Sequence, residues 1–109
     1  MKDTFEMTAS EYGGEAQVVI EKSYQGFKVN ENDKVTQIAK ASALALGLKG
    51  DTCIAGGGSD GSIMNQYGIP SVVLGVGYEN IHTTSERIST KDLYMLANQL
   101  LKIIELVTE

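Results

Sequence analysis

Residues 52–77 read TCIAGGGSDGSIMNQYGIPSVVLGVG and contain two short apolar runs with a glycine-rich turn between them. The first run, 52–55, leads into Gly56–Gly58, and Ser59 then stands where the N-cap of a helix is expected. The second run, 71–74, is too short and too uniformly apolar for an amphipathic helix. We therefore predict a strand, a glycine turn, a short helix and then a strand buried on both faces.

Two longer helices are predicted on either side of this unit. Apolar residues recur with a period near 3.6 over 35–46, before Gly47, and again over 89–107. The short helix between the two strands is expected to end at Tyr67, because Gly68 follows it. Candidate N-caps are Asn30 or Asn32 for the first long helix and Ser89, with Asp92 three residues later, for the second.

The N-terminal residues predict one further helix and one strand. Residues 1–12 place apolar side chains on one helical stripe that Gly13 and Gly14 end, and no capping residue precedes Met1, as expected in a piece of a longer chain. Residues 15–24 alternate like a half-exposed strand. Helices between short strands imply right-handed crossovers, so the expected class is α/β, with a partial, mostly parallel sheet flanked by helices and open at its edges.

Composition argues against several classes of protein. The chain has 109 residues, 42% of them apolar, which suits a single folded domain and argues against disorder. Nine basic against fourteen acidic residues give a net charge of −5, so nucleic acid is not an expected partner. No apolar stretch approaches the ~20 residues that cross a bilayer, so no membrane partner is expected. The single cysteine, Cys53, is expected to be a small buried hydrophobe, and its lack of a disulfide partner suits a cytoplasmic protein.

The glycine turn at 56–61 is the densest chemical signal in the chain. Its glycines allow a close backbone approach, and N–H groups at the start of the next helix can hold an anion or a carbonyl oxygen. A tight turn needs glycine in any case, so a purely structural interpretation carries about equal weight. The turn also has the G-x-S-x-G spacing of a nucleophile elbow. One alternative is therefore a serine hydrolase that uses Ser59, His82 as base and Glu79 or Asp60 as acid.

His82 is the only histidine of the chain and lies in the loop predicted over 75–86. That loop follows a predicted parallel strand, so it should lie at the same edge of the sheet as the glycine turn. We expect the imidazole and the glycine turn to face a common cavity. A catalytic zinc site uses about three protein ligands, and a chain with one histidine and one cysteine cannot form a convincing one alone.

The ordered strings GGGSDG (56–61), YGIP (67–70), LGVG (74–77) and NIHTTSE (80–86) resemble the C-terminal part of the co-catalytic zinc peptidases related to peptidase T. These are tripeptidase-like aminopeptidases of the family that also holds diaminopimelate desuccinylases and glutamate carboxypeptidases. The resemblance implies a metallopeptidase that hydrolyses short peptides with a metal-activated water. It also implies that 1–24 is a remnant of a lid or dimerisation domain and that 25–109 is the C-terminal part of the catalytic domain.

By position, the resemblance implies that His82 is the last ligand of a site with two zinc ions, and that the catalytic base lies upstream. The substrate-binding residues that it implies are Gly56, Gly57, Gly58, Ser59, Asp60 and Asn80. The chain is thus expected to be a fragment without activity of its own. Its expected partners are a short peptide substrate and either a second copy or the missing part of the same enzyme. A third interpretation is a non-catalytic binding or assembly module that pairs through the strand edge at 15–24.

Overall fold

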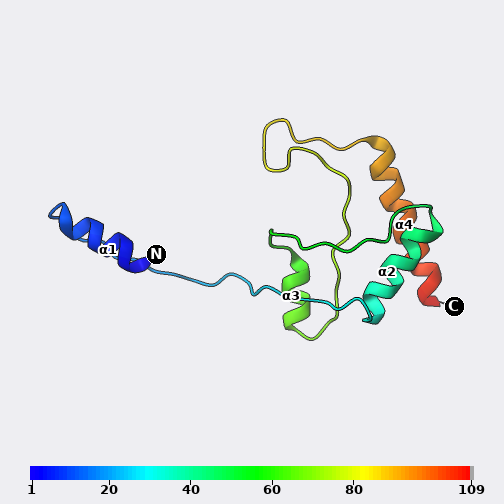
Figure 1. The fold of residues 1–109 in the computed structure, drawn as a ribbon, viewed down its shortest axis with the longest axis horizontal. Coiled ribbons are helices and arrows are strands. Elements are labelled where there is room, and N and C mark those ends of the chain that lie inside the picture. Colours follow the sequence, from blue (N-terminus) through cyan, green and yellow to red (C-terminus); the bar gives the residue numbers. More distant parts are fainter. Residues whose placement is uncertain (109) are drawn as a thin grey trace.

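The computed structural model describes residues 1–108 and has four helices in that range (Figure 1). They are α1 (Lys2–Glu11), α2 (Lys34–Ala45), α3 (Asp60–Gln66) and α4 (Thr90–Thr108). Each one lies where the sequence predicts a helix. None of the described helices is both long enough and apolar enough to cross a membrane.

Glycine follows three of these helices as predicted, and Gly13, after α1, has a φ angle of 72°. Gly47 follows the last residues of α2 and Gly68 follows the last residues of α3, with φ angles of 72° and 77°. The backbone is left-handed at these angles, and glycine adopts that conformation without the steric cost that a Cβ atom brings. The chain therefore turns sharply after each helix.

The start of α4 confirms its predicted cap, whereas the start of α2 does not. The Asp92 N–H donates to Ser89 Oγ at 3.0 Å, and Ser89 Oγ donates to Asp92 Oδ2 at 2.6 Å. The N-cap of α2 is Asp33, so the predicted Asn30 or Asn32 cap is wrong. The Asn30 N–H instead donates to Asp33 Oδ2 at 2.8 Å, which forms a local turn just before the helix begins.

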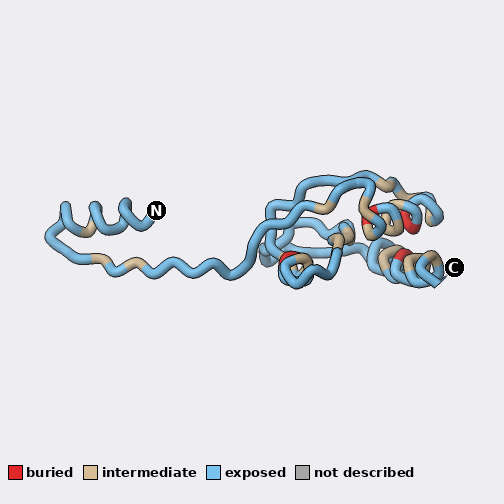
Figure 2. Tube along the Cα trace, turned by 90° about the horizontal axis from the view of Figure 1, so that it is seen from below, coloured by how far each residue is buried: buried red, intermediate tan, exposed pale blue. Residues whose placement is uncertain are grey.

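The main tertiary contact joins α2 to α4, and Figure 2 shows the buried positions confined to helices. Ser42 is fully buried and Ala43 is 6% exposed, and these small side chains let the two helices approach closely. The Gln99 side chain is buried on α4, where its Nε2 atom lies 3.3 Å from Ser42 Oγ and 3.4 Å from the Ala39 carbonyl oxygen. An amide that reaches across from α4 therefore links the helices.

The apolar face predicted on α4 is only partly covered. Leu96 and Ile103 are half-buried. Other members of the same face are between 48% and 60% exposed, namely Leu93, Leu100, Ile104 and Val107. Within the described residues, the apolar face of α4 is therefore partly uncovered.

The predicted sheet is not observed among residues 1–108. Segments 15–24, 52–55 and 71–74 have no assigned strand, and the one β-bridge is antiparallel, between Glu79 and Arg87. A strand is stabilised by a neighbour that completes its hydrogen bonds, and the chain does not bring these segments into register with one another. The expected burial fails for the same reason, because Val73 is 57% exposed and Ile54 is wholly exposed.

The exposure of Cys53 and the separate position of α1 both follow from the absence of a sheet in the described chain. Cys53 is exposed, contrary to the predicted buried position, because no second layer covers its segment. Helix α1 stands apart from the other helices at the end of a long extended connection (Figure 1). The described chain accordingly spans 66 × 35 × 18 Å.

Gln99→Ala should destabilise the α2–α4 pair by about 1–2 kcal/mol, because it removes the cross-helix amide and leaves Ser42 Oγ with one fewer partner. Urea unfolding followed by circular dichroism measures the change. Gln66→Ala, at the exposed end of α3, is the matched control and should be close to neutral. Equal effects of the two substitutions would contradict the assigned role of Gln99.

Glu31 should make stability depend on pH in the acid range. A hydrogen bond from Lys40 holds the pKa of Glu31 below its ordinary value of 4.5, with further lowering by Thr52 and by the Lys40 charge. Because the folded-state pKa is lowered, this contribution is fully present above pH 4.5 and is lost as the pH falls through the folded pKa. The urea midpoints of the natural chain and Glu31→Gln should differ at pH 7 and converge in strong acid. A difference that persists below the folded pKa would refute this assignment.

Candidate functional site

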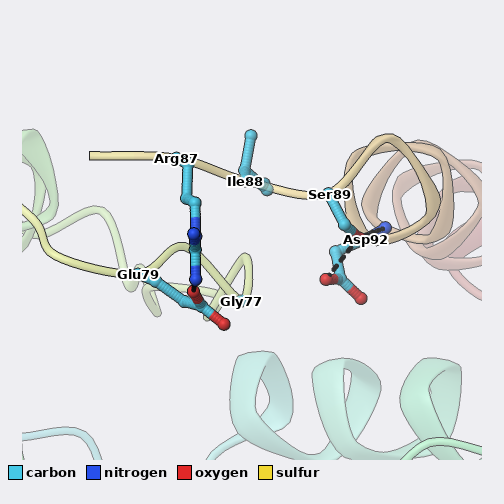
Figure 3. A pocket seen from close by; sticks show the side chains of 6 residues that line it. All are labelled: Gly77, Glu79, Arg87, Ile88, Ser89 and Asp92. Atoms are coloured by element: carbon cyan, nitrogen blue, oxygen red, sulfur yellow. Dashed lines mark hydrogen bonds and ion pairs between the residues drawn. The ribbon is translucent and has the colours of Figure 1, made fainter. Parts of the chain in front are cut away.

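The loop that carries His82 is closed at its base by a paired Glu79 and Arg87. Their backbones exchange two hydrogen bonds, of 2.8 Å from the Glu79 N–H and 3.1 Å from the Arg87 N–H. Their side chains also pair, with Arg87 Nε donating to Glu79 Oε2 at 2.7 Å (Figure 3). Both side chains are exposed, so the ion pair adds modest stability and the backbone bonds set the register.

Two consecutive turns form the body of this loop. The Thr83 N–H donates to the Asn80 carbonyl oxygen at 3.2 Å, and the Thr83 hydroxyl donates to the same oxygen at 2.7 Å. The Glu86 N–H in turn donates to the Thr83 carbonyl oxygen at 3.2 Å. The loop between its two fixed ends is thus held by a continuous set of local bonds.

His82 occupies an uncommon backbone conformation at the tip of the first turn. Its φ angle is 62° and that of Asn80 is 54°, the left-handed region that costs most residues about 1–2 kcal/mol. A positive φ at the third residue of a four-residue turn is the mark of a type II turn, where glycine or asparagine is usual. The His82 N–H donates to Glu86 Oε2 at 2.6 Å, and the side chain is exposed.

The three glycines of the turn at 56–58 have different surroundings. A side chain at Gly56 or Gly57 would meet open space, so these two positions leave their backbone accessible. A Cβ atom at Gly58 would instead overlap the phenol ring of Tyr24. The sequence did not single out Tyr24, because its contact spans more than thirty residues and follows no local pattern.

Ser59 and Asp60 begin α3 next to these glycines. Ser59 is the N-cap by position, with extended φ and ψ angles of −153° and 164°, but its side chain makes no capping hydrogen bond. Asp60 is exposed in the first turn of the helix. Ser59 is therefore the N-cap residue of α3, as predicted, but its hydroxyl group accepts no capping hydrogen bond.

Asn65 fixes α3 to the segment that follows it. Its Nδ2 atom donates to the carbonyl oxygens of Gly61, at 2.7 Å, and Ser71, at 2.9 Å, and its Oδ1 atom accepts the Ser71 N–H at 3.2 Å. Sequence reasoning missed this residue. The signal for it, an asparagine inside a short helix before a glycine and a proline, is too common to be specific.

Figure 1 places the glycine turn and the His82 loop at the edge of the main body that faces away from α4. A cavity of about 200 Å³ lies at the base of the loop, and neither His82 nor a residue of the glycine turn lines it. Its lining residues are Gly77, Glu79, Arg87, Ile88, Ser89 and Asp92 (Figure 3). A common cavity between the turn and the imidazole thus stays a prediction.

Within residues 1–108, no three His, Cys, Asp or Glu side chains come together in a way that could hold a metal ion. The described residues alone therefore do not fit a complete zinc site. The same part of the chain contains no hydrogen bond between Ser59 and His82, the pair on which the serine hydrolase alternative depends.

The sequence matches Peptidase family M20/M25/M40 over residues 4–106, and the chain belongs to this family. It is 60% identical to a tripeptidase of Staphylococcus aureus subsp. aureus Mu50, whose solved structure it matches over 97% of its length with a TM-score of 0.82. It also matches the structure of aminopeptidase PepT from Bacillus cereus ATCC 10987, at 42% identity over 99% of the chain and a TM-score of 0.78.

Curated relatives give the same picture. The chain is 43% identical to the Bacillus subtilis protein YqjE over 105 residues, which is 96% of the length of the chain. It is 35% identical to peptidase T of Limosilactobacillus fermentum over 78 residues, which is 72% of the length of the chain. The resemblance to peptidase T-like proteins is thereby confirmed, and the neighbours have the predicted α/β class. The chain spans 28% and 19% of these two relatives, and 28% and 29% of the two solved chains.

Gly58→Ala should displace the Tyr24 ring from the turn without unfolding the chain, because a tyrosine side chain can rotate away. Nuclear magnetic resonance detects this as loss of the contacts between the Tyr24 ring protons and residue 58. Gly57→Ala is the control, which should keep the Tyr24 contacts and change stability by less than about 0.5 kcal/mol. A Gly58→Ala chain with unchanged Tyr24 contacts would contradict the close packing of this ring on the turn.

Proposed function

We propose that this chain forms one part of a tripeptidase-like aminopeptidase that hydrolyses short peptides. The observation that carries the proposal is the likeness to the staphylococcal tripeptidase, which extends over nearly the whole chain at high identity. Family membership supports the assignment to the hydrolases, and short peptides as the substrate are the part that we propose.

We assign two groups of residues to the peptidase site. His82 would contribute one metal ligand, and its exposure at the tip of a tightly bonded loop supports this role. The open backbone at Gly56 and Gly57 supports a peptide-binding role for the turn. The residues assigned to substrate binding are Gly56, Gly57, Gly58, Ser59, Asp60 and Asn80.

Zinc is the expected metal, but this chain supplies one imidazole and no grouped set of further ligands among the described residues. The remaining ligands and the catalytic base would come from residues beyond this 109-residue segment. The chain alone is therefore expected to hydrolyse no peptide. The serine hydrolase alternative is not favoured, because the family match points to a different class of hydrolase.

The division into a lid remnant at 1–24 and a catalytic part at 25–109 also belongs to this proposal. The separate position of α1 supports it (Figure 1). The exposed apolar residues Val19 and Ile20, 74% and 65% exposed, would pair with another copy or with the remainder of the enzyme. We place the whole protein in the cytoplasm, where an exposed unpaired Cys53 is compatible with the reducing conditions.

A chimera tests the function directly. Replacing the matching segment of the staphylococcal tripeptidase with this chain should preserve tripeptide hydrolysis, and His82→Asn in the chimera should lower kcat/KM by more than about 100-fold. Lys34→Ala, at the exposed start of α2 in the main body, is the control substitution. A folded but inactive chimera would overturn the proposed function, and hydrolysis by the pure 109-residue chain with added zinc would overturn its predicted inactivity.

A further inference from the structure

The Glu86 side chain forms a hydrogen bond to the main chain of His82 within the loop. Its Oε2 atom accepts the His82 N–H at 2.6 Å, a short hydrogen bond to a charged acceptor. Such bonds are roughly twice as strong as those between neutral groups. The bond closes a ring from residue 82 to residue 86 on the exposed tip of the loop.

We propose that Glu86 is a positioning residue that fixes the left-handed backbone of His82 and so aims its imidazole. The inference rests on the proposed function of His82 in the peptidase site. Glu86 itself would touch neither the substrate nor the reacting atoms.

The first support is the conformation that the bond has to hold. At a φ angle of 62°, the Cα–Cβ bond of His82 points in a direction different from that in an extended or helical backbone. This conformation is intrinsically unfavourable for a residue with a Cβ atom, so it needs interactions that favour it. The carboxylate of Glu86 provides one at the N–H group of the same residue.

The second support is that Glu86 is itself held. Its backbone N–H donates to the Thr83 carbonyl oxygen at 3.2 Å, so the side chain starts from a fixed position. The adjacent Arg87 could compete for the carboxylate, but its guanidinium is paired with Glu79 at 2.7 Å. The two acidic side chains of the loop therefore have separate partners, and that of Glu86 is the backbone of His82.

The third support is that the hydrogen bonds given for the other loop side chains do not involve the His82 N–H. The Thr83 hydroxyl donates to the Asn80 carbonyl oxygen, and it lies 3.1 Å from Ser85 Oγ. The Thr83 groups close the turn that contains His82, and they leave the His82 N–H to Glu86. A metal-binding imidazole must be held within about 0.5 Å of its place, which free rotation at His82 would not permit.

The test is made on the 109-residue chain by nuclear magnetic resonance. In the natural chain, the His82 amide proton should resonate downfield and exchange slowly, and its coupling constants should report a positive φ. Glu86→Ala should move the amide upfield, speed its exchange by about 10-fold or more and shift φ to negative values. Glu86→Gln keeps an acceptor oxygen of the same reach and should restore most of the signature.

Glu11→Ala, an exposed glutamate at the end of α1, is the matched control and should leave the His82 signals unchanged. A Glu86→Ala chain that keeps the His82 amide signature and the positive φ overturns the proposal. These readouts need no metal and no activity, so they stand apart from the test of the proposed function.

The activity chimera then measures the consequence. Glu86→Ala in an active chimera should lower kcat/KM by about 10- to 100-fold, with recovery in Glu86→Gln, as other residues that orient metal ligands do. Full activity of Glu86→Ala would overturn the positioning role. An inactive parent chimera would instead overturn the proposed function, while the amide measurements would still decide whether Glu86 fixes His82.

Discussion

The contact between α2 and α4 is the interaction on which the folded part of this chain depends. It brings together segments that are almost sixty residues apart, through a buried glutamine amide and a row of small side chains on α2. Such a contact is specific, because an amide that reached an apolar surface would lose its hydrogen bonds. It leaves much of the apolar surface of α4 exposed.

The four helices could be predicted from the sequence because their signals are local. Apolar spacing, a serine three residues before an aspartate and terminal glycines act within one or two turns of helix. Helix α4 shows the first two signals, and α2 and α3 show the third. The predicted strands depended on distant neighbours. Segments such as 71–74 are apolar enough for a buried strand, yet no strand in the described chain pairs with them.

The candidate site was predictable to a similar degree. The single histidine and the triple glycine stand out as residue types, and their order along the chain carried the resemblance to a peptidase. The roles of Tyr24 and Glu86 could not be inferred, because they arise from the path of the backbone. A tyrosine over a distant glycine and a glutamate bonded to a main-chain N–H leave no mark in composition or periodicity.

The contact between Tyr24 and Gly58 also joins two regions that are far apart in the sequence. Tyr24 lies on the arm that leads from α1, whereas Gly58 lies in the turn before α3. A movement of the arm would lift an aromatic ring from the peptide backbone and uncover one side of the turn. The position of the segment that carries Tyr24 therefore determines how much of the peptide backbone at Gly58 is covered.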